Sequence, residues 1–247
     1  MQESSHVDTN SWLITGANGN LGKRLIATLL DNPQCRVTAV VRSDRAEQAI
    51  TSLPLAPEQR ARLVTRVLDY TDVDALRNAA QGCSRAVHLV GILKETRSAT
   101  YRQAHEDSTA ALLQALPQSG VEHLTYLSIV GSSPASKNAC LASKGRAESL
   151  CLDAAMPACV LRVPMVLGEG DYASFALAAR ARKRLSFTFR ADSQEQPIYA
   201  GDVVTAIIAA GSDKVAGALD LGGPEVLTRR ALTQRAAAVL GETATVV

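Results

Sequence analysis

The sequence lacks the features that mark several specialised classes of protein. It has no apolar run that approaches the length of a membrane span, and its polar start, MQESSHVDTN, carries no secretory signal. Its five cysteines are scattered without a C-x-x-C pair, and none of its four histidines has a metal-ligand spacing. We therefore expect reduced thiols, no metal site and a cytoplasmic location.

A strong charge of either sign is also missing. The net charge is +2, which is too small to argue for binding of nucleic acid or of an acidic membrane surface. The densest basic stretch, ARARKR at 179–184, is short and is interpreted as a solvated helix face. With 247 residues, of which 47% are hydrophobic, the chain is long enough for one large α/β domain.

What the sequence does contain is a regular alternation of short apolar runs and longer amphipathic stretches. Strands are predicted at 12–15, 36–42, 62–69, 85–91, 123–128 and 158–163. Helices are predicted at 21–30, 46–53, 72–82, 99–116 and 138–150, with Asp72 as an N-cap. This repetition predicts a doubly wound (Rossmann) α/β fold, which is a mostly parallel sheet with helices on both faces.

The C-terminal third is less regular. Helices are predicted at 173–183, 202–211 and 229–240, and short strands at 185–189, within 218–228 and from 243. Asp202 is interpreted as a helix cap.

A glycine-rich stretch, TGANGNLG at 15–22, joins the first predicted strand to the first helix. Its glycines permit a tight turn and a close approach of a pyrophosphate, and the helix start offers free N–H groups. At this junction the spacing predicts a dinucleotide site. The alternative is a turn that only lets the helix and strand pack together. The predicted cofactor-binding residues here are Gly16, Asn18, Gly19, Asn20, Leu21 and Gly22.

The second strand ends in AVVRSDR, where an acidic residue would bind the ribose 2′-hydroxyl of NAD. Arg42 occupies that place, with Arg45 nearby, and a guanidinium suits a 2′-phosphate. NADP(H) is therefore the favoured cofactor, while Asp44 leaves NAD(H) as the alternative. A solvent-exposed strand end is the structural alternative for Arg42.

Several further segments resemble the extended and atypical short-chain dehydrogenase/reductase family over nearly the whole chain. They include LDYTD (68–72), VHLVGI (87–92), AHEDSTAALLQA (104–115), GVEHLTYLSIVG (120–131) and VLRVPMVLGEGD (160–171). The nearest branches are the NmrA-like members, those related to the 39 kDa accessory subunit of respiratory complex I, and the NAD-dependent epimerases and dehydratases. His105 stands where many members have Asn.

The resemblance implies further site residues and a domain plan. The residues implied to contact the cofactor are Asp69, Tyr70, Val90, Gly91, Ile92, Lys144 and Pro164. Ser128 is implied as the active-site Ser donor, for which Ser132 and Ser133 are alternatives; a strand-end cap is its structural reading. We expect a single NAD(P)-binding domain over 1–247, with 164–200 and 222–247 forming a small substrate-side lobe.

The chain departs from the family at its active site. The family uses Tyr-x-x-x-Lys, in which the Lys holds the nicotinamide ribose and the Tyr exchanges a proton. Here the segment NACLASKGRAESL (138–150) places Cys140 four residues before Lys144, on one helical face. The thiol is shorter than a phenol, so it is a poor replacement. The chain also stops at Val247, where relatives usually continue.

Several interpretations of these positions stay open. Cys140 is most simply a small apolar filler, and the alternatives are a redox-sensitive thiol or an acid acting through water. Lys144 has the alternative of an exposed helical lysine, and Arg162 is expected to anchor a local carboxylate. A tyrosine elsewhere is a further substitute for the missing phenol; the candidates are Tyr101, Tyr126, Tyr172 and Tyr199.

Two functions follow as hypotheses. The first is an NAD(P)(H)-dependent oxidoreductase or epimerase-like protein that acts on a small carbonyl or alcohol, with catalysis weakened by Cys140. The second is a non-catalytic NADP(H) sensor or an assembly or accessory protein. The expected partners are a small molecule or none, with a homo-oligomer or an assembly partner open, and no nucleic acid.

Overall fold

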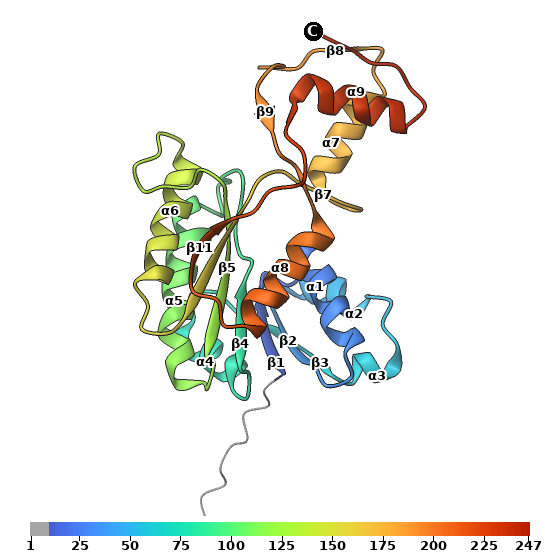
Figure 1. Cartoon of the computed structure of the whole chain (residues 1–247). Coiled ribbons are helices and arrows are strands. Elements are labelled where there is room, and N and C mark those ends of the chain that lie inside the picture. Colours follow the sequence, from blue (N-terminus) through green and yellow to red (C-terminus); the bar gives the residue numbers. More distant parts are fainter. Residues whose placement is uncertain (1–9) are drawn as a thin grey trace, which may run out of the picture. The chain divides into compact units, whose positions relative to one another are not determined.

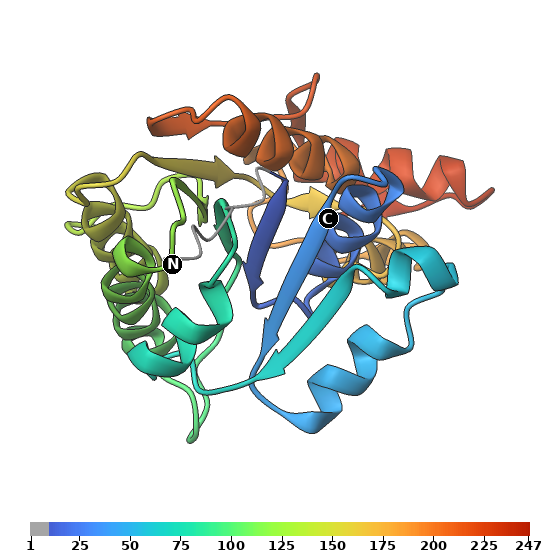
Figure 2. The same ribbon diagram turned by 90° about the horizontal axis from the view of Figure 1, so that it is seen from below.

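The computed structural model describes residues 10–247, and it contains a seven-stranded sheet with the strand order β11-β6-β5-β4-β1-β2-β3 (Figures 1 and 2). Its strands are β1 (Ser11–Thr15), β2 (Arg36–Val41), β3 (Leu63–Val67), β4 (Arg85–His88), β5 (His123–Ile129), β6 (Ala158–Val163) and β11 (Gly217–Asp220). β1 pairs in parallel with β2 and β4, β2 with β3, and β4 with β5. The predicted doubly wound α/β fold is confirmed.

Helices cover both faces of this sheet, with α4, α5 and α6 on one face and α1 and α8 on the other (Figures 1 and 2). Their bounds are α1 (Asn20–Asp31), α2 (Asp44–Thr51), α3 (Pro57–Arg60), α4 (Val73–Ala80), α5 (Ser108–Ala115), α6 (Ala139–Leu152) and α8 (Ala200–Ser212). The Asp72 side chain accepts a hydrogen bond from Ala75 N at 2.9 Å, so the predicted cap of α4 is confirmed.

The central strands β1, β4, β5 and β6 are largely buried, because helices cover both sides of the sheet there. All five residues of β1 are buried, including Trp12, Leu13 and Ile14. Glycine lets α8 approach this strand closely, since a Cβ atom at Gly211 would lie 2.6 Å from the Trp12 ring. The sheet and its helices therefore form one core whose strand ends have fixed positions.

Two sequence predictions in this region need correction. The single helix predicted at 99–116 is three elements: the π-helix η1 (Arg102–Asp107), α5 and the 3-10 helix η2 (Leu116–Gln118). Sequence periodicity does not separate a π-turn from an α-turn, and such turns occur often at functional sites. Asp202 lies in the first turn of α8 rather than at its cap, where its charge favours the helix dipole.

The chain divides into two compact units. Unit 1 runs to Arg162 and includes Val204–Leu219, and unit 2 comprises Val163–Val203 and Asp220–Val247. Unit 2 contains β7 (Val166–Leu167), α7 (Tyr172–Ala181), β8 (Leu185–Ser186), β9 (Gln194–Glu195), β10 (Ile198–Tyr199), β12 (Leu227–Thr228), α9 (Arg229–Val239) and β13 (Thr245–Val246). Three two-stranded pairings, β10-β7, β12-β9 and β13-β8, connect these strands.

Candidate functional site

The glycine loop between β1 and α1 depends on the absence of side chains at two points. Gly16 has φ +72°, and a Cβ atom there would lie 2.9 Å from the backbone of Leu89 and Val90. At Gly22 a Cβ atom would lie 2.4 Å from Ala17 O, so only glycine lets α1 pack against the loop. These contacts alone fit the alternative that the glycine motif only lets the helix and strand pack together.

The start of α1 has a feature that packing alone does not require. Gly19 is the N-cap and has no side chain that could cap the helix, and the first turn has no acidic residue. Asn18 and Gly19 are exposed. The helix therefore presents uncapped N–H groups and the positive end of its dipole to an anion.

A cavity of about 640 Å³ lies beside this loop, within unit 1. It is lined by Gly16, Asn18, Gly19, Arg42, Ser43, Ala46, Asp69, Tyr70, Thr71, Leu89, Val90, Gly91, Ile92, Ser98, Ala99, Gln103 and Ala104. Nine of the residues predicted to bind the cofactor are among them: Gly16, Asn18, Gly19, Arg42, Asp69, Tyr70, Val90, Gly91 and Ile92. The volume falls in the range of cofactor sites.

The other predicted residues do not line this cavity. Asn20, Leu21 and Gly22 belong to the first turn of α1, Lys144 lies behind Gly91, and Pro164 belongs to unit 2. Sequence reasoning missed Ser98, Ala99, Gln103 and Ala104, which come from the loop before η1 and from its start. No sequence motif marks these four. Ser43 was also missed, although a serine just before a helix is an N-cap signal, and its Oγ does accept from Ala46 N at 3.3 Å.

Arg42 and Asp69 follow the ends of β2 and β3 and line the same end of the cavity. The Asp69 carboxylate accepts hydrogen bonds at 2.8 Å from both Thr71 N and Thr71 Oγ1. These bonds lower the pKa of Asp69, and the charge of Arg42 lowers it further. Arg42 is exposed at the cavity wall. This end of the cavity therefore holds a guanidinium available to an anion and a carboxylate that stays ionised.

Tyr70 ties the glycine loop to the sheet. Its hydroxyl accepts a hydrogen bond from Gly16 N at 3.2 Å and donates to Val40 O at 3.3 Å. Burial raises the pKa of Tyr70, so the phenol stays protonated and able to donate. The sequence placed Tyr70 at the site but gave no sign of this contact, which joins residues 54 positions apart.

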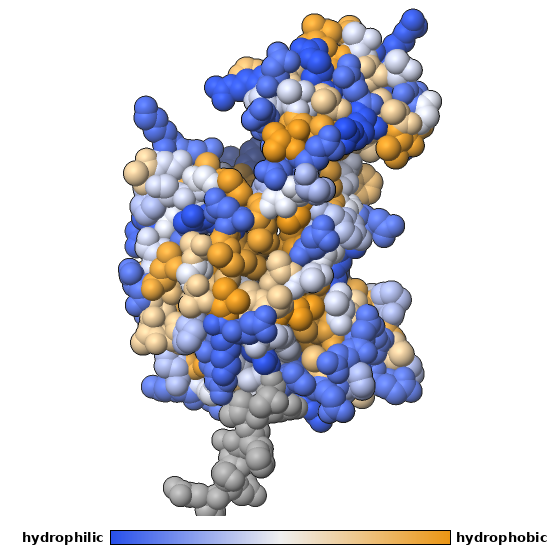
Figure 3. Space-filling view, in the orientation of Figure 1, coloured by the Kyte–Doolittle hydropathy of each residue, from blue (hydrophilic) through white to orange (hydrophobic). Residues whose placement is uncertain are grey.

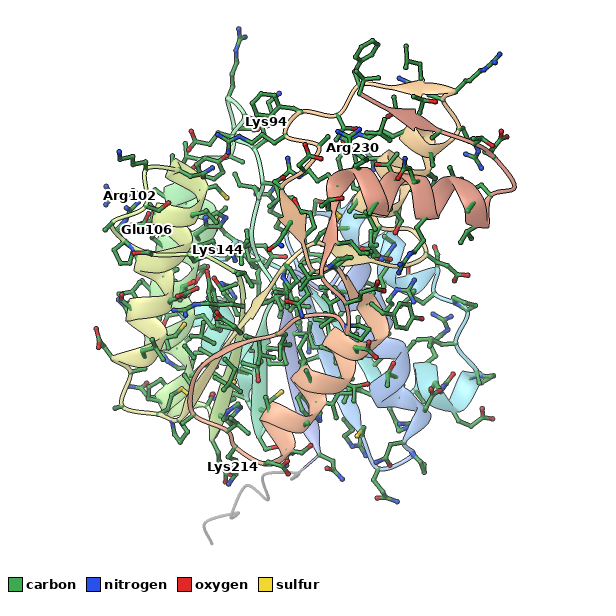
Figure 4. All side chains as sticks on the ribbon, turned by 45° about the horizontal axis from the view of Figure 1, so that its top comes forward. Lys94, Arg102, Glu106, Lys144, Lys214 and Arg230 are labelled. Carbon is green, nitrogen blue, oxygen red and sulfur yellow. The ribbon has the colours of Figure 1, made fainter. Side chains whose placement is uncertain are left out.

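Lys144 on α6 is buried, so the reading as an exposed helical lysine is wrong (Figure 4). Its ammonium donates to Leu127 O at 2.9 Å and lies 4.6 Å from the centre of the Tyr126 ring. A Cβ atom on Gly91 would lie 3.1 Å from Lys144 Nζ, so the glycine makes room for the ammonium. Because Gly91 lines the cavity, Lys144 lies directly behind the cavity wall.

Burial lowers the pKa of Lys144 to about 8, from 10.5. Between these values the unfolded chain holds a proton that the folded chain has lost, so stability rises with pH. We predict that the free energy of unfolding, measured relative to Lys144→Met, increases by about 1 kcal/mol between pH 7 and pH 9. Urea unfolding at several pH values tests this, and a difference that stays flat or falls contradicts it.

Two buried histidines accompany the lysine. His88 Nδ1 lies 2.6 Å from Thr15 Oγ1, and His88 Nε2 lies 3.3 Å from Ser108 Oγ. Burial lowers the pKa of His88 to about 3 and that of His105 to about 4, with the Lys144 charge adding to both shifts. Both rings are therefore neutral. His105 Nε2 lies 3.1 Å from both Ile92 N and Ile92 O. The ring therefore holds the backbone of Ile92, which lines the cavity.

Cys140 lies in the first turn of α6, where the Asn138 side chain caps the helix by accepting from Cys140 N at 3.0 Å. Its Sγ lies 3.6 Å from Ile92 O, in hydrogen-bonding contact as a thiol. Burial raises the pKa of Cys140, and the Lys144 charge offsets only part of that effect. Lys144 therefore does not make Cys140 a thiolate at neutral pH, which favours the filler reading over the redox-sensitive one.

The four alternative tyrosines differ in position. Tyr126 is buried beneath Lys144, while Tyr172 and Tyr199 are exposed residues of unit 2. Tyr101 stacks on the His105 ring at 5.6 Å, and its hydroxyl donates to Leu93 O at 3.0 Å. Tyr101 therefore contacts Leu93 and His105, next to the Ile92 end of the cavity wall.

The remaining predicted residues have structural partners. Ser128 is buried and donates to Ser132 Oγ at 3.3 Å. Arg162 grips the buried Glu148 carboxylate, with its Nε at 3.0 Å and its Nη2 at 2.7 Å from Oε2, so its predicted anchoring role is confirmed.

Glu106, on η1, accepts hydrogen bonds of 2.8 Å from Ser143 Oγ and from Arg146 Nε and Nη2, both on α6 (Figure 4). These bonds connect η1 to α6. Within residues 10–247, no helix has the length and apolar character needed to cross a bilayer, and no cluster of three metal-ligating side chains occurs.

Two curated proteins are similar to this chain in sequence. Subunit 9 of the NADH dehydrogenase [ubiquinone] 1 alpha subcomplex, mitochondrial, of Arabidopsis thaliana is 25% identical over 227 residues, covering 90% of this chain and 56% of that protein. A ceramide reductase of Caulobacter vibrioides is 28% identical over 171 residues, covering 68% of this chain and 51% of that protein. The chain spans about half the length of these curated relatives.

Solved structures agree on the fold. A UDP-glucuronic acid 4-epimerase of Bacillus cereus in complex with NAD superposes with a TM-score of 0.78 at 18% identity, covering 96% of this chain and 87% of that one. A dTDP-glucose 4,6-dehydratase of Streptomyces venezuelae with NAD bound gives 0.77 at 19%, covering 96% and 84%. A family model described as NAD(P)H-binding matches residues 16–167. The fold and the sequence pattern are of the atypical short-chain dehydrogenase/reductase type, and the chain belongs to this NAD(P)H-binding family.

Proposed function

We propose that this protein binds NADP(H) in the unit 1 cavity and is an oxidoreductase or epimerase-like member whose catalysis is weakened because Cys140 replaces the active-site tyrosine. The single observation that carries the proposal is the cavity, which the glycine loop lines at one point, up to Gly19 at the N-cap of α1, and Arg42 lines at another. A glycine turn that served packing alone would need no such cavity.

The loop and the start of α1 would hold the diphosphate through backbone N–H groups. Arg42 and the Ser43 hydroxyl would receive the 2′-phosphate, and Asp69 would lie beside the adenine. When bound, the dinucleotide supplies hydride chemistry. Lys144 would keep Gly91 and Ile92 in place from behind the wall and supply a positive charge near the nicotinamide end. We also propose that unit 2 is the substrate side.

Cofactor choice gives the direct test. Arg42→Ala should raise the dissociation constant for NADPH by about 10- to 100-fold, because a charge-assisted hydrogen bond to phosphate is lost, and should leave NADH binding nearly unchanged. Isothermal titration with both nucleotides measures this. Arg66→Ala is the matched control, since Arg66 is an exposed arginine on β3 outside the cavity. Equal affinity of the unaltered protein for both nucleotides would refute the NADP(H) assignment.

A non-catalytic NADP(H)-holding accessory protein is the second candidate. Two observations favour it. The Cys140 thiol donates a hydrogen bond to Ile92 O, and burial raises the pKa of this thiol. Curated relatives include subunits of NADH dehydrogenase. Turnover of NADPH by the unaltered chain over a panel of carbonyl compounds would eliminate this candidate.

A further inference from the structure

Unit 2 exposes several large apolar side chains, while one of its core clusters is built from alanine. Its core cluster consists of Ala181, Ala237 and Ala244, with Ala236 packed against it. All three phenylalanines of the chain belong to this unit, and Phe175, Phe187 and Phe189 are 69%, 77% and 81% exposed. An isolated exposed apolar residue is ordinary, but aromatic residues outside an alanine core need an explanation.

The apolar exposure follows the pattern of a strand. β8 pairs in parallel with β13, and the pairing continues as Thr188 N donates to Val247 O at 3.0 Å. Leu185 and Phe187 are exposed on one side of this segment, while Ser186 between them is buried, and Phe189 is exposed in the turn that follows. At β8 the apolar side chains therefore face outward and the polar one inward.

Positive charge surrounds this strand face. Residues 180–190 contain Arg180, Arg182, Lys183, Arg184 and Arg190, and no acidic residue. In the part of the chain that the structure describes, none of these five forms an ion pair with a carboxylate. Three acidic residues of unit 2 are already paired: Glu195 with Arg229, Asp192 with Arg230 and Glu225 with Arg235.

The basic stretch at 179–184 is only partly helical, contrary to its reading as a solvated helix face. α7 ends at Ala181, so Arg182–Arg184 lead directly into β8. The cations and the apolar strand face are therefore contiguous. We call Arg180–Arg190 together with Val247 the basic–aromatic edge, and apolar surface over β8 and the C-terminal end is visible in Figure 3.

We propose that the basic–aromatic edge docks on an anionic lipid bilayer. Phe187 and Phe189 enter the boundary between headgroups and acyl chains, while the arginine and lysine side chains contact the lipid phosphates. Charge complementarity selects this occupant, because five cations without carboxylate partners would be repelled by a basic partner and attracted by acidic headgroups. The exposed aliphatic Leu185 on the same edge suits acyl chains, whereas a nucleic acid would bind through the cations and the aromatic rings and leave this side chain unused.

Vesicle flotation of the full chain tests the proposal. Binding is expected to vesicles of phosphatidylcholine mixed with phosphatidylglycerol, to be weaker at high salt, and to be absent with phosphatidylcholine alone. Phe187→Ser with Phe189→Ser should lower the apparent affinity by about tenfold or more, without unfolding, because both side chains are exposed. Arg182→Gln with Lys183→Gln and Arg184→Gln should lower it similarly and weaken the salt dependence, because three of the five cations are removed.

The controls are Leu150→Ser and Arg66→Gln, which change an exposed apolar residue and an exposed cation of unit 1; both should bind vesicles normally. NADPH affinity should be unchanged in all of these variants, which separates this test from that of the nucleotide site. Absence of binding to anionic vesicles by the unaltered protein overturns the proposal. So does binding that both edge variants retain, or dimerisation through Phe187 and Phe189 in place of vesicle binding.

Discussion

Cys140→Tyr should raise NADPH-dependent carbonyl reduction by about a hundredfold or more, the contribution expected from a positioned general acid. Position 140 lies one turn before Lys144 on α6, and the two groups already interact, since each shifts the pKa of the other. A phenol oxygen would extend several ångströms further from the helix than Sγ does. The ammonium of Lys144 would lower the pKa of that phenol.

Loss of NADPH absorbance with a panel of small aldehydes and ketones is the measurement. Cys140→Phe is the matched control, because it adds the ring without the hydroxyl and should leave turnover at the level of the unaltered protein. If Cys140→Tyr binds NADPH normally and still reduces no carbonyl, the accessory function becomes the better account of the protein. A rise in turnover for Cys140→Phe as well would mean that ring packing, and not proton transfer, had been restored.

Gly22→Ala should destabilise the protein by about 2 kcal/mol and raise the dissociation constant for NADPH by about tenfold or more. The new Cβ would lie 2.4 Å from Ala17 O and 2.8 Å from Ala17 Cα, so the backbone of the loop or the helix must move. Alanine's better helix propensity offsets only part of this cost. The displaced loop would no longer align its N–H groups with the diphosphate.

Urea unfolding measures the first effect and isothermal titration with NADPH the second. Thr28→Ala changes an exposed residue of the same helix and should leave both quantities nearly unchanged. A Gly22→Ala variant of normal stability would show that α1 relaxes around the methyl group. If NADPH binding then also persisted, the loop would not be the site of diphosphate contact.

The sequence was sufficient for the sheet and for much of the cavity because the relevant signals are local. Strand and helix periods, the Asp72 cap and the glycine spacing each act over a few residues, and the doubly wound topology follows from them. Arg42 also followed from position alone, since the end of the second strand of such a fold borders the site.

The parts that sequence reasoning missed depend on contacts between distant segments. Whether Lys144 is exposed depends on how α6 packs against the ends of β4 and β5, and its Leu127 partner has no motif. The direction of the Cys140 pKa shift is a balance between burial and charge, and only burial in the fold decides it. Sequence periodicity also does not predict the π-turn in η1 or the exposed side of β8, because both depend on packing against distant segments.

The hydroxyl of Tyr70 has a consequence for how a ligand would be received. By joining Gly16 N to Val40 O, it holds the front of the glycine loop against the sheet. A diphosphate arriving there would meet a cradle that is already ordered, so little chain entropy would be lost on association. The nucleotide would then bind to a preformed site, and Arg42 would determine the selectivity at the ribose end.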